Sequence, residues 1–153
     1  MKKAIIEILL VEDNEYDIEL TLRALHEDHL ANTIHVARDG EEALAFLADC
    51  EARVNGGEGA MPRLILLDLK LPKVDGHQVL RQVKANPVTK MIPVVVLTSS
   101  KQDEDMLKSY LTGVKSYIQK PVDFERFRKI VKDLGLYWLV VNQLPSPVAA
   151  VTR

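Results

Sequence analysis

The sequence predicts an α/β protein built around a five-stranded parallel sheet, and three observations support that prediction. Five apolar runs of strand length alternate with amphipathic stretches of helical period along the 153 residues. Three of these runs are almost continuous in Leu, Ile and Val, which is typical of parallel strands covered on both faces. Turn and helix-start residues separate the runs, so the chain reads as repeated strand–helix units.

The expected strands are the five apolar runs, at 5–11, 33–37, 64–68, 93–98 and 116–120. A helix is expected after each of them, because apolar residues recur there at helical spacing. The residues that set this spacing are Ile18, Leu22 and Leu25; Ala43, Leu44 and Leu47; Val79, Leu80 and Val83; Met106, Leu107, Tyr110 and Leu111; and Phe124, Phe127, Ile130, Val131 and Leu134. We expect a doubly wound sheet of order 2-1-3-4-5 with five helices.

Local signals place several of the boundaries. The pairs Asp39-Gly40 and Asp75-Gly76 predict the starts of the second and third helices. Asn86-Pro87 predicts the end of the third helix, since the residue before a proline is pushed away from helical geometry. The Gly-rich, polar stretch at 51–63 predicts a long flexible loop.

Composition narrows the class of protein. A hydrophobic content of 47%, a charged content of 27% and a net charge of -2 are ordinary for a globular domain and argue against a nucleic-acid partner. The single cysteine, Cys50, excludes an internal disulfide. The longest apolar stretch near the C-terminus, LYWLVV, is too short to span a bilayer, and no signal peptide is visible. We therefore expect a cytoplasmic protein without a membrane partner.

Charged and polar residues stand where the strands end. Glu12 and Asp13 follow the first strand, Asp68 ends the third, Thr98 ends the fourth, and Lys120 ends the fifth. In a doubly wound sheet, ligands bind beyond the carboxyl ends of the strands at the switch point. Three carboxylates there need counter-charge, which Lys120 supplies in part and a divalent cation would complete.

The ligand types indicate which cation and which reaction. Carboxylate oxygens without His or Cys suit a hard ion, and Mg²⁺ is the expected one. A metal, a carboxylate nucleophile, a hydroxyl and a lysine are the components of phosphoryl transfer through an aspartyl phosphate. Each residue also has a simpler interpretation. Glu12 and Asp13 could serve a helix start, Lys120 could be a solvated loop lysine, and Thr98 could be an ordinary strand residue.

Four segments carry a resemblance to a known family. LLVEDN, LILLDLKLPKVDG, VVVLTSS and SYIQKP resemble the signature segments of the receiver domain of two-component response regulators, over about residues 5 to 134. The resemblance implies a flavodoxin-like fold. It also implies that the protein is not an enzyme in the usual sense, because a receiver domain catalyses only its own phosphorylation and dephosphorylation. It implies Mg²⁺ as cofactor and a phosphohistidine on a sensor histidine kinase as donor.

The same resemblance implies a role for each site residue. Asp68 would be the phosphoacceptor, Glu12 and Asp13 the acidic pair, and the backbone carbonyl of Lys70 a further metal ligand. Lys120 would pair with the phosphoryl group, with Thr98 as the switch hydroxyl and Tyr117 as the switch aromatic, although an ordinary half-buried aromatic would also explain Tyr117. These are the residues that we expect to carry the function.

The C-terminal part resembles a subgroup, the single-domain response regulators that partner bacterial phytochromes. The likeness implies a receiver domain over 1–134, no DNA-binding output domain, and a homodimer through the fourth helix, fifth strand and fifth helix. Large apolar residues at 135–145 could cap the core of the domain, but their number favours a partner or dimer surface, with Phe127, Tyr137 and Trp138 as candidate interface residues. Residues 146–153 predict a disordered tail.

Three other functions stay open on the sequence. A flavin-type cofactor binder would need a Gly-rich phosphate loop where this chain has EDNEYD. A Mg²⁺-dependent phosphatase would commonly have a second Asp two residues after the nucleophile, where this chain has Lys70. A pseudo-receiver would use the same fold as an interaction scaffold with a vestigial site.

Overall fold

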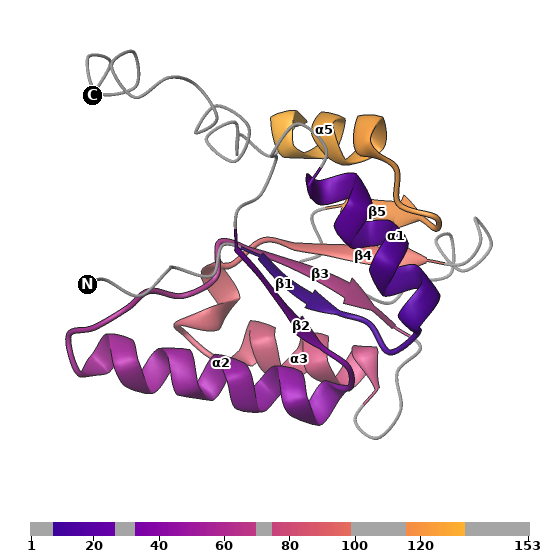
Figure 1. The fold of residues 1–153 in the computed structure, drawn as a ribbon. Coiled ribbons are helices and arrows are strands. Elements are labelled where there is room, and N and C mark those ends of the chain that lie inside the picture. The colour runs from indigo at the N-terminus through magenta and orange to yellow at the C-terminus, as the bar shows by residue number, and fades with distance from the viewer. Residues whose placement is uncertain (1–7, 27–32, 70–74, 99–115, 134–153) are drawn as a thin grey trace, which may run out of the picture.

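The computed structural model describes residues 8–26, 33–69, 75–98 and 116–133, and it shows a five-stranded parallel sheet with helices on both faces (Figure 1). The strand order is β2-β1-β3-β4-β5, as the sequence predicts. The strands are β1 (Ile8–Val11), β2 (Ile34–Ala37), β3 (Leu64–Asp68), β4 (Val94–Thr98) and β5 (Ser116–Gln119). All five expected strands are therefore present.

The three continuous apolar runs form the centre of the sheet. Every residue of β1, β3 and β4 is buried, whereas β2 lies at one edge and is mostly half-buried. Val11 is paired with Ala37 on one side and with Leu67 on the other, so the carboxyl ends of β2, β1 and β3 are level. This register brings the residues that follow β1 beside the last residue of β3.

Two apolar clusters cover the two faces of the sheet, because successive strand residues point to opposite sides. The first contains Ile8 and Leu10 of β1 together with Leu64 and Leu66 of β3, and it is covered by α1 (Glu15–His26) and α5 (Phe124–Asp133). The second contains the alternate residues and is covered by α2 (Gly40–Asn55) and α3 (Gly76–Ala85), on the opposite side of the sheet (Figure 1).

Helix starts and ends follow the local signals. The Asp39 side chain accepts a hydrogen bond of 2.7 Å from the Glu42 amide, and the Asp75 side chain accepts one of 3.0 Å from the Gln78 amide. Each is thus the N-cap of its helix. Asn86 is the C-cap of α3, and the short 3-10 helix η2 (Thr89–Met91) leads from there to β4.

The predicted loop at 51–63 is wrong at its beginning, because α2 continues to Asn55. Residues 51–54 contain good helix formers, and Arg53 pairs with Asp49 one turn earlier at 3.1 Å. The helix ends at Gly56, whose amide donates to the Ala52 carbonyl, and Gly57 and Gly59 then adopt positive φ angles of 85° and 66°. The irregular connection is therefore shorter than the composition suggests.

The interface assignment of Phe127 is also corrected. Its side chain is 0% exposed and belongs to the apolar cluster under α1 and α5, because α5 turns its apolar face onto the sheet. The expected fourth helix and the candidate interface residues Tyr137 and Trp138 lie outside the described residues. Among the helices that the structure describes, none is both apolar enough and long enough to span a membrane.

Candidate functional site

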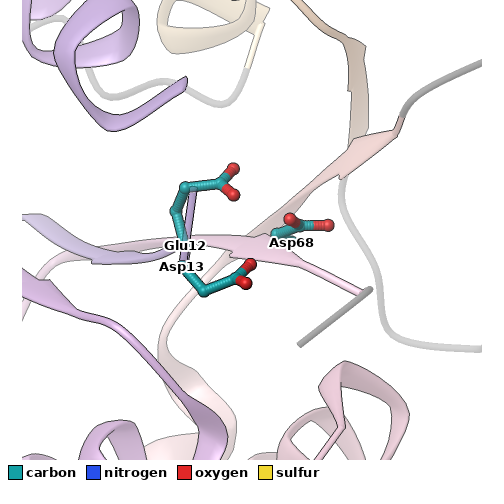
Figure 2. Close-up of side chains that lie close together, drawn as sticks. All are labelled: Glu12, Asp13 and Asp68. Carbon is teal, nitrogen blue, oxygen red and sulfur yellow. The ribbon is translucent and has the colours of Figure 1, made fainter. Parts of the chain in front are cut away.

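Three carboxylates meet at the carboxyl edge of the sheet. Glu12 and Asp13 directly follow β1, Asp68 is the last residue of β3, and one oxygen from each side chain lies within 4.8 Å of the others. Figure 2 shows the three carboxylates pointing into the same space. Glu12 is 0% and Asp68 4% exposed, whereas Asp13 faces solvent. The site thus has one solvent-exposed and two buried carboxyl groups.

The alternation of the strands explains which face these groups occupy. Glu12 continues the series of Ile8 and Leu10, and Asp68 continues that of Leu64 and Leu66, so both take the face covered by α1. Asn14 caps the start of α1, because its side chain accepts a hydrogen bond of 2.9 Å from the Asp17 amide. Glu12 and Asp13 are therefore not the capping residues of α1.

Lys120 supplies positive charge to this cluster. Its Nζ lies 2.9 Å from Asp68 Oδ2, 2.9 Å from Glu12 Oε1 and 3.2 Å from Asp17 Oδ2, and its side chain is only 14% exposed. The contact with Glu12 has the distance of an ion pair, but Glu12 Oε1 has no hydrogen bond of good geometry in the described part of the chain. The Lys120 amide donates to the Thr98 carbonyl at 2.7 Å, which ties this lysine to the end of β4. It is not a solvated loop lysine.

Burial and charge shift two of the pKa values. The pKa of Glu12 is raised from 4.5 to about 7, mainly because burial removes water from the carboxylate; Asp68 adds to the rise and Lys120 opposes it. Burial alone would lower the pKa of Lys120, but the hydrogen bonds and charges of Glu12 and Asp68 outweigh it and raise that pKa above its usual value. Lys120 is therefore an ammonium ion throughout the physiological range.

The cluster fits a hard divalent cation. All three side chains offer oxygen ligands, and a cation beside the buried Glu12 carboxylate would favour its charged form, which burial disfavours. The expected ligand carbonyl of Lys70 lies outside the described residues. Glu12, Asp13 and Asp68 are thus the described residues that would hold Mg²⁺.

The two expected switch residues lie on neighbouring strands. Thr98 is 3% exposed, and its buried Oγ1 has no hydrogen-bond partner within the described ranges, which is costly for a hydroxyl. Tyr117 of β5 is half-buried against the cluster under α2 and α3, and by alternation Thr98 takes the same face as Val94 and Val96 in that cluster. The hydroxyl of Thr98 is an available donor beside the acidic edge.

Sequence reasoning missed two residues at this edge. Asp17 belongs to the first turn of α1 and contacts Lys120 from there. The sequence indicates this only indirectly: Asp17 precedes Ile18, an apolar residue that packs on the face of the sheet on which Lys120 lies. At Gly76 a Cβ would lie 2.4 Å from the Leu69 Cα and 2.6 Å from the Asp68 carbonyl oxygen, so no side chain fits. Gly76 lets the start of α3 approach the backbone that carries Asp68.

The fold, the acidic edge and the lysine define the class of α/β proteins with an oxygen-ligand metal site at the switch point of the sheet. The family model described as response regulator receiver domain matches residues 8–132. The chain belongs to this family. Receiver domains bind Mg²⁺, in agreement with the acidic cluster found here. They partner histidine kinases and are in general not conventional enzymes.

Two relatives match nearly the whole chain. The probable methanogenesis regulatory protein FilR2 of Methanothrix harundinacea is 44% identical over 140 residues, which is 92% of this chain and 88% of FilR2. The response regulator Rcp1 of Synechocystis sp. is 40% identical over 139 residues, which is 91% of this chain and 92% of Rcp1.

Solved structures of response regulators are similar to this chain in both fold and sequence. The bacteriophytochrome response regulator AtBRR is 49% identical, with a TM-score of 0.77 over 89% of this chain and 96% of its own. The phosphorylated cyanobacterial phytochrome response regulator RcpA is 40% identical, with a TM-score of 0.65 over 89% of this chain and 95% of its own. The Mn²⁺-bound form of Rcp1 is 40% identical, with a TM-score of 0.64 over 86% of this chain and 93% of its own.

Proposed function

We propose that this chain is a stand-alone response regulator that accepts a phosphoryl group on Asp68 from a sensor histidine kinase, in a Mg²⁺-dependent reaction, and signals by contact with other proteins. The observation that carries the proposal is the placement of the Lys120 ammonium 2.9 Å from Asp68 Oδ2, beside the carboxylates of Glu12 and Asp13. This combination supplies a nucleophile together with the charges that phosphoryl transfer needs.

The reaction follows from these contacts. An Oδ of Asp68 attacks the phosphorus of a phosphohistidine, an O–P bond forms as the N–P bond breaks, and the electron pair returns to the imidazole nitrogen. The Lys120 ammonium balances charge on the phosphoryl oxygens, and the orphaned Thr98 hydroxyl has a donor to offer them. Mg²⁺ held by Glu12, Asp13 and Asp68 would neutralise further charge on the same oxygens.

The phosphoryl group would change the surface through Thr98 and Tyr117. Replacing a carboxylate by a phosphoryl aspartate adds about one negative charge at the site, enough to bias an element with two arrangements. Drawing the Thr98 hydroxyl toward that group would open room for Tyr117 on the same face. The proposed domain organisation is a receiver domain over 1–134, an apolar segment at 135–145 that mediates homodimer formation, and a tail at 146–153.

The partner is proposed from the comparisons. AtBRR and RcpA are described as phytochrome response regulators, which supports a bacterial phytochrome as the kinase for this chain. FilR2 is described as a probable methanogenesis regulatory protein, so the proteins similar to this chain also include one whose description names no phytochrome. A kinase of this kind consumes ATP, which implies a cytoplasmic location. Transfer of phosphate from an autophosphorylated phytochrome kinase, compared with an unrelated histidine kinase, tests the pairing.

The phosphoacceptor is tested by intact mass spectrometry. The wild type, Asp68→Asn and Asp49→Asn are incubated with a small acyl-phosphate donor, with Mg²⁺ or with a chelator. Asp49 is a matched control because it is an exposed aspartate of α2 that pairs with Arg53. We expect one added phosphoryl group in the wild type and in Asp49→Asn only when Mg²⁺ is present, and none in Asp68→Asn. No uptake from a donor or a kinase, together with no Mg²⁺ binding, would favour the pseudo-receiver scaffold.

A further inference from the structure

Asp17 is a fourth carboxylate at the site that has no part in the metal cluster. Its Oδ2 lies 3.2 Å from Lys120 Nζ, yet the three clustered side chains that could hold a cation are Glu12, Asp13 and Asp68. Asp17 belongs to the first turn of α1 and reaches the site because α1 covers the face of the sheet on which Lys120 lies. Its contact with the lysine is thus set by packing across more than one hundred residues of sequence.

The number of donors on Lys120 makes this contact important. An ammonium group has three N–H donors, and three carboxylates surround it within 3.2 Å: those of Glu12, Asp68 and Asp17. A phosphoryl oxygen on Asp68 would be a further acceptor for this ammonium and would compete with the carboxylates already beside it. The side chains of Glu12 and Asp68 are 0% and 6% exposed, whereas that of Asp17 is 26% exposed. Asp17 is the partner that water can rehydrate at the lowest cost.

We propose that Asp17 is a positioning residue that competes with the phosphoryl group of Asp68 for the Lys120 ammonium, and so lowers the affinity of the site for that group. This inference rests on the proposed function. Exchange of the Asp17 contact for a phosphoryl contact also frees the first turn of α1 from the end of β5. A purely structural Asp17, which only complements the dipole of α1, would lower stability when removed and leave phosphoryl affinity unchanged.

The test uses beryllofluoride, a stable analogue of the phosphoryl group, titrated by calorimetry at saturating Mg²⁺ into the wild type, Asp17→Asn and Glu19→Gln. Glu19 is the matched control, because it loses the same charge on the same helix and pairs with Arg23 rather than with Lys120. We expect Asp17→Asn to bind the analogue about fivefold more tightly, which corresponds to about 1 kcal/mol for a partly exposed ion pair. Glu19→Gln should bind like the wild type.

A double-mutant cycle with Lys120→Gln separates competition from simple repulsion between Asp17 and an anion. If Asp17 acts through Lys120, the gain from Asp17→Asn disappears in the Lys120→Gln background. A gain that persists there, or an Asp17→Asn variant that binds no more tightly than the wild type, overturns the inference. Thermal denaturation without ligand gives an independent readout: Asp17→Asn should be no more stable than the wild type alone, but should gain more stability from the analogue.

The two proposals fail in different ways. A wild type that takes up no phosphoryl group and binds no beryllofluoride refutes the proposed function, and the role of Asp17 with it. A wild type that does both, combined with an Asp17→Asn variant that behaves like Glu19→Gln, refutes only the competition at Lys120.

Discussion

Replacing Glu12 by glutamine should stabilise the metal-free protein at neutral pH. Glu12 is 0% exposed, and its pKa is raised from 4.5 to about 7, first by desolvation and then by Asp68. The folded state therefore binds more protons than the unfolded chain between these two values. As a result, the free energy of unfolding falls as the pH rises through this interval, and the penalty is fully present above about pH 7.

The magnitude follows from the shift. A change from 4.5 to about 7 corresponds to about 3 kcal/mol at the upper end of the interval, and to almost nothing below its lower end. Glutamine has the shape of the neutral carboxyl group and never ionises. We therefore expect Glu12→Gln to match the wild type in acid and to exceed its stability by about 3 kcal/mol above neutrality.

Urea denaturation in chelator at about pH 5 and about pH 8 measures the difference, with Glu19→Gln as a control for the loss of a carboxylate on the exposed surface of α1. Mg²⁺ should reduce the advantage of Glu12→Gln, since a bound cation favours the ionised carboxylate of the wild type. An equal difference between Glu12→Gln and the wild type at both pH values would refute the reasoning, because it would show that Glu12 does not titrate in this interval.

Three further predictions concern packing and the switch. Gly76→Ala should destabilise the protein by about 1–3 kcal/mol, because its Cβ meets the backbone of Leu69 and Asp68. The control variant Gly56→Ala should have nearly wild-type stability, because its Cβ would have only ordinary contacts at 3.5 and 3.6 Å. If urea denaturation showed the same loss of stability in both variants, a clash at Gly76 would not be the cause. Phe127→Ala should cost about 3–5 kcal/mol of unfolding free energy, because the side chain is 0% exposed. A stable variant that only loses self-association would restore Phe127 as an interface residue. Thr98→Val should leave stability unchanged or slightly raised, because Oγ1 has no partner in the part of the chain that the structure describes. The same variant should lose the spectral change of Tyr117 in NMR when beryllofluoride binds, and an unaltered response would exclude Thr98 from the switch.

Local signals account for what sequence reasoning predicted well. Asp39, Asp75 and Asn86 act within four residues of their own position, so a single sequence is enough to place the helix boundaries that they make. The loop prediction is wrong at 51–55 because the three glycines of the stretch, Gly56, Gly57 and Gly59, all follow the end of α2 and give no information about the residues before them. The Asp49–Arg53 pair on the helix surface was the overlooked signal.

By itself, the sequence determined the parallel strand–helix alternation, the two faces of each strand, and the placement of Glu12, Asp13, Asp68 and Lys120 at one edge of the sheet, whereas the strand order 2-1-3-4-5 was assumed and then found in the structure. These features follow from periodicity, because parallel strands with helices between them must all end at the same edge. Tertiary structure alone decided that Glu12 is completely buried, that Phe127 faces its own core, that Gly76 touches β3 and that Asp17 shares Lys120. Each of these depends on how closely two elements distant in sequence approach, and that distance is set by the packing of all the side chains between them.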